Sequence, residues 1–166
     1  EPFQEGDEPR SDSLPSYLHT LITKWESAVQ PAIEAGASVA LIRLGVVLDA
    51  NGGALQGVLP LFRKKLGGRQ GSGRPIMPWI RLADVVSGLA FLVERPDIVG
   101  PVNFVSPSAC SNDRVMKALA KALGSPCRVP MLSPFARLVM GEAASELVLA
   151  GQRVEPKVLL EKGYSF

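Results

Sequence analysis

Apolar residues recur at helical spacing along residues 14–35. A polar, proline-bearing stretch precedes them over residues 1–12, and Gly36 follows them as a favourable stop. Pro31 has no backbone N–H, so we expect a bend or an early end near position 30. The pattern predicts an amphipathic helix after a loop or truncated linker. Its apolar face comprises Tyr17, Leu18, Leu21, Ile22, Trp25, Val29 and Ile33.

Residues 38–48 change the pattern from helical spacing to a nearly continuous apolar run. The sequence SVALIRLGVVL is rich in β-branched residues, which is typical of a strand that is buried on both faces in a parallel sheet. A helix followed by such a strand indicates an α/β fold.

Helices and short strands keep alternating to the end of the chain. Helical spacing predicts helices over 55–66, 84–94 and 133–149, a fourth that begins at Ser111 or Asn112, and a last one from Pro156. The apolar face of the 84–94 helix is expected at Val85, Val86, Leu89, Leu92 and Val93, with Asp84 as its cap or in its first turn. Extended segments are expected over 75–80, 102–105 and 128–131.

Composition narrows the function classes without naming one. The net charge is +2 and the basic residues are scattered, apart from those at 63–65, which argues against nucleic acid as a partner. His19 is the single histidine and the two cysteines have no metal-ligand spacing, so we expect no metal site. Two cysteines in a chain of 166 residues favour reduced thiols and a cytoplasmic location, and no apolar run is long enough to cross a membrane.

The glycine-rich segment 67–73 is the most prominent candidate for ligand binding. Glycines expose backbone N–H groups that can hold a phosphate. However, Gly71, Ser72 and Gly73 follow a helix, and Ile76 stands where the third glycine of a G-x-G-x-x-G motif belongs. Two interpretations stay open: a mobile loop over a substrate pocket, or a plain connection.

Two further patterns bear on chemistry. A Tyr-x-x-x-Lys pair would lower the pKa of the tyrosine for proton transfer, but Tyr17 is followed at that spacing by Leu21. The tract that contains Trp79, Arg81 and Asp84 suits ligand recognition where a strand meets a helix. The alternative is structural, with Trp79 in the core, Asp84 as a cap and Arg81 on a solvated rim.

The order of several motifs resembles one family of α/β proteins. Nearly the whole chain, from about residue 17 onward, is similar to the epimerase-like branch of the extended short-chain dehydrogenases, some of which carry a cell division inhibitor label. The motifs, in chain order, are Thr23-Lys24-Trp25-Glu26, Arg43-Leu44-Gly45-Val46-Val47-Leu48, Gly52-Gly53-Ala54-Leu55, Leu66-Gly67-Gly68, Gly71-Ser72-Gly73, Trp79-Ile80 with Asp84, Gly100-Pro101-Val102-Asn103, Gln152-Arg153-Val154 and Gly163-Tyr164-Ser165-Phe166.

The resemblance implies that residues 13–166 are the C-terminal half of such a protein. The fold would be the last part of a Rossmann-like parallel sheet with flanking helices plus a small substrate-binding lobe, and the dinucleotide-binding half would be missing. By position, Gly45, Val46 and Val47 would lie at the cofactor, NADP or NAD. The substrate would lie towards Gly71, Ser72, Gly73, Trp79 and Arg81.

The function that the resemblance implies is NAD(P)-dependent epimerisation or redox chemistry on a small, sugar-like molecule by the intact protein, with the fragment alone inactive. A histidine is usual in the family where Arg81 stands, which makes the substrate preference uncertain. The catalytic acid or base stays unknown, and a homodimer stays open. The alternative is a cofactor-binding regulatory or interaction protein without turnover, as the cell division label suggests. The absence of the Tyr-x-x-x-Lys pair weakens a claim of ordinary dehydrogenase chemistry.

Overall fold

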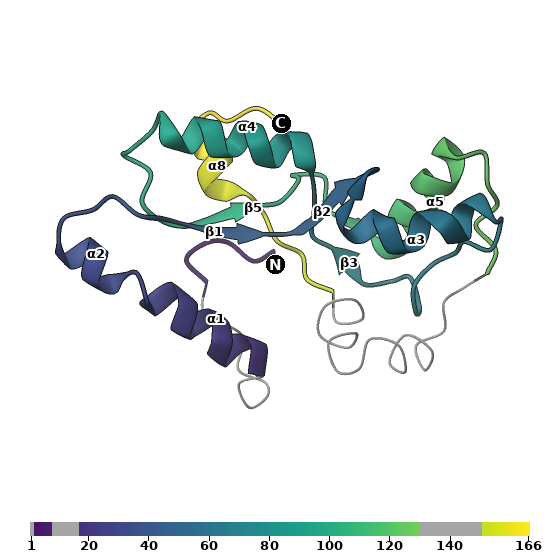
Figure 1. The fold of residues 1–166 in the computed structure, drawn as a ribbon, viewed down its shortest axis with the longest axis horizontal. Coiled ribbons are helices and arrows are strands. Elements are labelled where there is room, and N and C mark those ends of the chain that lie inside the picture. The colour runs from purple at the N-terminus through teal and green to yellow at the C-terminus, as the bar shows by residue number, and fades with distance from the viewer. Residues whose placement is uncertain (1, 8–16, 130–150) are drawn as a thin grey trace.

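The computed structural model describes residues 2–7, 17–129 and 151–166 of the chain, which form an α/β structure (Figure 1). The helices are α1 Tyr17–Ser27, α2 Gln30–Glu34, α3 Gly53–Arg63, α4 Leu82–Val93, α5 Asn112–Ala122 and α8 Lys157–Glu161. The strands are β1 Ala40–Leu44, β2 Val46–Asp49, β3 Ile76–Met77, β4 Trp79–Arg81, β5 Gly100–Phe104 and β6 Cys110–Ser111. The helix predicted over 133–149 lies outside the described residues.

The first of two lobes is built on the parallel pair β1 and β5. Helices α1 and α4 lie on opposite sides of this pair, and α8 lies against β5 (Figure 1). Arg43 of β1 bonds to Glu26 of α1, whereas Phe104 of β5 packs under Gly88 of α4. The buried core of this lobe comprises Ile80, Val85, Ile98, Val102, Phe104, Leu159 and Tyr164.

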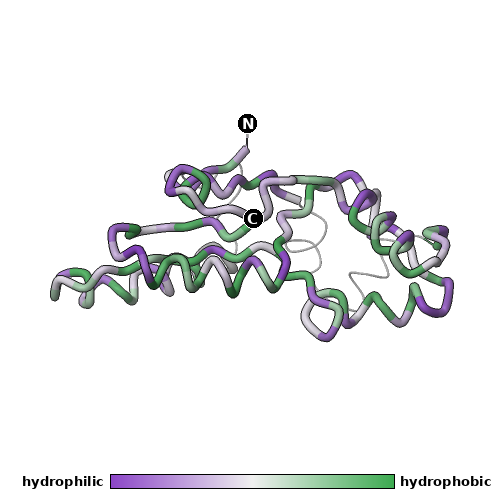
Figure 2. The backbone as a smooth tube through the Cα atoms, turned by 90° about the horizontal axis from the view of Figure 1, so that it is seen from above, coloured by the Kyte–Doolittle hydropathy of each residue, from purple (hydrophilic) through white to green (hydrophobic). Residues whose placement is uncertain are grey.

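The second lobe contains α3, α5 and the short antiparallel pair of β3 and β6. Phe62, Met116 and Ala120 form its buried core. Each lobe thus has its own buried core, and hydrophobic segments are present in both lobes (Figure 2). The parallel pair of β2 and β4 lies between the two lobes (Figure 1).

The single strand predicted over 38–48 is two strands with different partners. β1 pairs with β5, and after Gly45 the chain continues as β2, which pairs with β4. The prediction that this segment is buried on both faces is also wrong for β1, because Ile42 and Leu44 are exposed. The physical reason is that side chains of the described residues cover only part of the face of β1 that carries Ile42 and Leu44.

Local signals located the helix ends well. The first helix ends at Ser27, and α2 begins at Gln30 with Pro31 in its first turn, as Pro31 predicts. Ser111 caps α5 by accepting a hydrogen bond from the backbone N–H of Arg114. Asp84 lies in the first turn of α4, which is one of the two positions predicted for it. The predicted apolar face of α4 is partly wrong, because Val86, Leu89 and Val93 are exposed.

The N-terminal segment 2–7 packs on the first lobe. Phe3 pairs with Val154, and the buried Glu5 accepts hydrogen bonds from the backbone N–H groups of Asn103 and Val158, both at 3.2 Å. Among the described residues, no helix is long and apolar enough to cross a bilayer.

Candidate functional site

The junction of β1 and β2 at Gly45 brings three segments of the chain together. The N–H of Gly45 donates to the carbonyl of Phe104 at 3.0 Å, and the next N–H, of Val46, donates to the carbonyl of Pro78 at 2.7 Å. A Cβ on Gly45 would lie 2.7 Å from that Pro78 oxygen and 2.9 Å from Val105 Cγ1. Only glycine therefore lets the ends of β1 and β5 approach the start of β4 this closely.

Trp79 lies beside this junction. The β2–β4 register places it opposite Val46, and Ile80 opposite Val47. The Trp79 carbonyl accepts from the N–H of Ser106 at 2.6 Å, and its indole N–H donates to the carbonyl of Ser108 at 3.2 Å. The structure thus brings together the predicted residues Val46, Val47 and Trp79, and it adds the segment that follows β5.

Arg81 ends β4 as half of a bidentate ion pair. Its Nε and one terminal nitrogen each donate to Asp84 at 2.7 Å, and the arginine side chain is exposed whereas the carboxylate is nearly buried. The hydrogen bonds that Arg81 donates to Asp84, together with the charge of that carboxylate, raise the pKa of Arg81 above the ordinary value. Arg81 is thus held in one orientation, with part of the guanidinium open to solvent.

Asp84 also connects this ion pair to the C-terminus. Its backbone carbonyl accepts from the hydroxyl of Tyr164 at 3.0 Å, and that hydroxyl lies 2.5 Å from the Ser87 hydroxyl. Asp84 is not the helix cap, which was the other predicted position, because α4 begins at Leu82 with Arg81 as its N-cap residue. Its carboxylate pairs with Arg81 instead.

The segment 67–73 is anchored to the second lobe. The Asn112 side chain accepts from the N–H of Gln70 at 2.8 Å and donates to the Gln70 side chain at 2.9 Å, and the N–H of Asp113 bonds to the Gly73 carbonyl at 3.0 Å. Gly71 and Gly73 have φ of +55° and +71°, where glycine is strongly favoured. These contacts anchor the segment 67–73 on the first residues of α5. Between the described residues, no hydrogen bond joins Gly71, Ser72 or Gly73 to Trp79 or Arg81.

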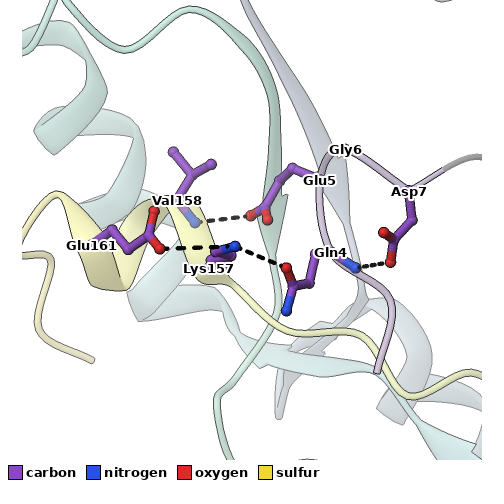
Figure 3. Close-up of a pocket in the computed structure, with 7 residues that line it drawn as sticks. All are labelled: Gln4, Glu5, Gly6, Asp7, Lys157, Val158 and Glu161. Carbon is purple, nitrogen blue, oxygen red and sulfur yellow. Dashed lines mark hydrogen bonds and ion pairs between the residues drawn. The ribbon is translucent and has the colours of Figure 1, made fainter. Parts of the chain in front are cut away.

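A cavity of ≈ 380 Å³ lies away from these residues, between the segment 2–7 and α8 (Figure 3). Most of its polar groups bond to one another. Lys157 donates to the Gln4 side chain at 3.0 Å, and the N–H of Gln4 donates to Asp7 at 2.8 Å. These contacts hold the N-terminal segment on α8, so we interpret this surface as structural.

Sequence reasoning missed Asn112 and Glu5, two buried polar residues whose side chains anchor segments distant in the chain. For Asn112 the sequence predicts only a helix start, and Glu5 lies in the stretch predicted as loop or truncated linker. An amide directly after a cap serine, opposite a glycine-rich loop, is a signal that could have pointed to Asn112. No signal in the sequence distinguishes Glu5 from the other acidic residues near it.

The described residues fit part of a dinucleotide site. The Gly45 to Val47 backbone and Trp79 form a wall beside the carboxyl ends of β1 and β5, and ligands in α/β sheets bind outside the carboxyl ends of strands. The pyrophosphate needs a glycine-rich turn before a helix N-terminus. Among the residues that the structure describes, the strand-to-helix turn before α3 carries Gly52 and Gly53, but it lacks the G-x-G-x-x-G spacing.

Comparisons with known proteins agree on one family. Residues 133–166 match a domain of unknown function, DUF1731. The chain is 41% identical over 150 residues to the epimerase family protein Mb2239 of Mycobacterium bovis, covering 90% of the chain and 50% of that protein. It is 38% identical to the mouse epimerase family protein SDR39U1, covering 98% of the chain and 55% of that protein.

Solved structures give the same picture. Human epimerase family protein SDR39U1, crystallised with NADPH, matches all of this chain with a TM-score of 0.90 and 32% identity, over 55% of the human chain. A nucleoside-diphosphate sugar epimerase from Corynebacterium glutamicum matches with a TM-score of 0.73 and 31% identity, over 30% of that chain. The chain thus spans about half the length of the curated relatives it matches.

Proposed function

The chain belongs to the epimerase family as the counterpart of the C-terminal half of its members, and on this premise we propose that it forms one wall of an NAD(P)-dependent active site. The intact protein would carry out epimerisation or redox chemistry on a small, sugar-like molecule. The observation that carries the proposal is the meeting of three segments at Gly45, with Trp79 alongside. A bound cofactor would supply the hydride chemistry.

The proposal assigns different roles to the two ends of this wall. Gly45, Val46 and Val47 would lie against the nicotinamide end of NADP or NAD, because they follow the end of β1. Trp79 and Arg81 would face the substrate, since they lie one strand further on. Gly71, Ser72 and Gly73 would line the substrate lobe on the loop that the first residues of α5 anchor. Residues 13–166 would be the C-terminal half of one domain, and a cytoplasmic location stays a prediction.

Turnover by a protein that joins this chain to a dinucleotide-binding half tests the proposal. We expect one of two results with at least one member of a panel: net oxidation of NADPH by a carbonyl compound, monitored by the loss of NADPH absorbance, or conversion of a nucleotide sugar to its epimer, measured by chromatography because epimerisation regenerates the cofactor. Cofactor binding without turnover on the whole panel would favour the alternative, a regulatory protein. That alternative is supported by Leu21, which stands where a short-chain dehydrogenase carries its lysine.

Arg81 should make the intact protein prefer an acidic ligand. Its guanidinium is oriented by Asp84 and still has N–H groups that face solvent, and such groups bind carboxylate or phosphate strongly. We expect Arg81→Ala to weaken binding of an acidic sugar about ten- to a hundredfold, with a neutral sugar little affected. Titration calorimetry on the intact protein would measure both.

Arg74→Ala is the matched control, because Arg74 is also exposed but lies on the segment that precedes β3. It should leave both affinities unchanged. If Arg81→Ala and wild type bind the acidic sugar equally well, Arg81 serves only to pair with Asp84.

A further inference from the structure

The second lobe is basic, although the whole chain is nearly neutral. Residues 53–77 contain five lysines and arginines and no acidic residue, and residues 110–129 contain four, with Asp113 as their one acidic residue. Since the net charge of the chain is +2, the rest of the chain is net acidic. A charge asymmetry of this kind between two parts of a chain indicates a nucleic acid or a membrane as a partner.

The C-terminal ends of α3 and α5 bring five of these cations together. The Ser125 hydroxyl donates to the carbonyl of Phe62 at 2.6 Å, and the N–H of Arg128 donates to the carbonyl of Gly67 at 3.1 Å. Residues 63–66 therefore lie beside the end of α5 and the segment that follows it, at the end of the second lobe that is remote from β1 (Figure 1). The five exposed cations are Arg63, Lys64, Lys65, Lys121 and Arg128. Within the part of the chain that the structure describes, none of them forms an ion pair.

Apolar side chains are exposed among these cations. Leu66 is 52% exposed and directly follows Lys65, Val129 is 47% exposed and directly follows Arg128, and Leu123 is 39% exposed. Surfaces that mix basic and apolar side chains are typical of contacts with anionic lipids, because lysine and arginine bind the headgroups while the apolar side chains enter the interface. We call the five cations, together with these three apolar residues, the α3–α5 surface.

Lys65 keeps its charge at a conformational cost. Its φ is +61°, and it is the one residue other than glycine with a positive φ in the described ranges. The N–H groups of Lys65 and Leu66 donate to the carbonyls of Phe62 and Leu61 at 2.9 and 2.8 Å, a helix ending in which glycine usually takes this conformation. Attraction to the helix dipole favours a cation anywhere in the last turn, so it does not require lysine at this position. Strain of this kind is found at functional positions.

We propose that the α3–α5 surface binds the surface of a membrane that contains anionic lipids, with its cations at the headgroups and its leucines and valine in the interface. Nucleic acid fits less well, because single strands stack their bases on aromatic side chains, and Phe62, the one aromatic residue of these two segments, is buried. An acidic protein also fits less well. Protein surfaces carry charges of both signs, whereas Asp113 lies in the first turn of α5, at the opposite end of that helix.

Sedimentation with lipid vesicles tests the proposal on the 166-residue chain, without any cofactor or turnover. We expect vesicles of equal parts phosphatidylcholine and phosphatidylserine to bind the chain about tenfold or more tightly than vesicles of phosphatidylcholine alone, because each cation near an anionic surface adds to the affinity. Lys121→Glu should weaken binding to the anionic vesicles by about tenfold or more, since it replaces an attraction by a repulsion. Added salt should weaken the binding of the wild-type chain as well.

Lys24→Glu is the matched control. Lys24 in α1 and Lys121 in α5 are both exposed lysines in the last turn of a helix of 11 residues, and the two variants have the same net charge. Lys24→Glu should bind the anionic vesicles as tightly as wild type, because Lys24 lies in the first lobe. Equal losses of binding in the two variants would overturn the proposal, and so would a wild-type chain that stays in solution with anionic vesicles at low salt.

Lys65→Gly separates a role in binding from a role in folding. Glycine adopts a positive φ without strain, so urea denaturation should find this variant at least as stable as wild type. Loss of the cation should nevertheless weaken binding to the anionic vesicles about fivefold. Unchanged binding by this variant would refute a role for the strained lysine at the membrane. Soluble polyglutamate that displaces the chain from vesicles, and whose own binding is equally sensitive to Lys121→Glu, would replace the membrane by an acidic protein as the partner.

Discussion

Replacing Phe104 by alanine should lower the free energy of unfolding by about 3–5 kcal/mol, the range for loss of a buried phenylalanine. Phe104 is fully buried at the end of β5, in the same core as Ile80 and Val102. Its ring lies so close to α4 that a Cβ on Gly88 would be 2.9 Å from it. Truncation would leave a cavity between the sheet and α4. Urea denaturation of the chain, followed by circular dichroism, would measure the loss.

The pairing of Phe104 with Gly88 gives this prediction an internal check. Gly88→Ala alone should destabilise the chain, because the new methyl group meets the ring. In a Phe104→Leu background the same change should cost less, since the two residues are in contact and their effects are not additive. Val99→Ala, at an exposed position, should change stability by less than about 0.5 kcal/mol. Equal costs of Gly88→Ala in both backgrounds would show that the ring is not what excludes a side chain there.

The parts of the fold that could be predicted from the sequence depend on local chemistry. Pro31 interrupts the first helix because it has no N–H to donate, and Ser111 caps α5 because its hydroxyl reaches the free N–H of Arg114. The order of strand and helix segments also gave the α/β class. Such signals act within a few residues, so a single sequence contains them completely.

The parts that could not be predicted depend on partners distant in the chain. The run 38–48 is almost entirely apolar, yet Ile42 is exposed because the side chains around a strand decide its burial. Val86, Leu89 and Val93 of α4 are exposed for the same reason. Apolar residues at helical spacing thus predict an apolar face of the helix but do not indicate what covers it. The pairing of Asn112 with Gln70 spans 42 positions, and no short motif records it.

The candidate site was predicted in part. The resemblance implies that Val46 lies at the cofactor and Trp79 towards the substrate, and the β2–β4 register pairs these two residues directly. The glycines at 71 and 73 indicate a turn, but no short motif indicates that the buried amide of Asn112 holds this loop. The orientation of Arg81 by Asp84 follows from their spacing of three residues, which brings side chains together at a helix start.

Adding a single methyl group at Gly45 should lower the free energy of unfolding by about 1–3 kcal/mol, the range for an overpacked core. The methyl group would lie 2.7 Å from the Pro78 carbonyl oxygen and 2.9 Å from Val105 Cγ1. The Pro78 carbonyl cannot retreat freely, because it accepts from the N–H of Val46. Gly45→Ala should therefore separate β4 from the β1–β2 junction, and urea denaturation would measure the cost.

Gly57→Ala is the matched control for this change. Gly57 lies within α3, and nothing is within 4 Å of a Cβ built there. Alanine in a helix interior is favoured over glycine by about 0.5–1 kcal/mol, so this variant should be more stable than wild type. The two substitutions have the same chemistry and opposite expected signs. Gly45→Ala with wild-type stability would mean that the junction can widen, and that the close approach of β4 and β5 to Gly45 is not what requires glycine.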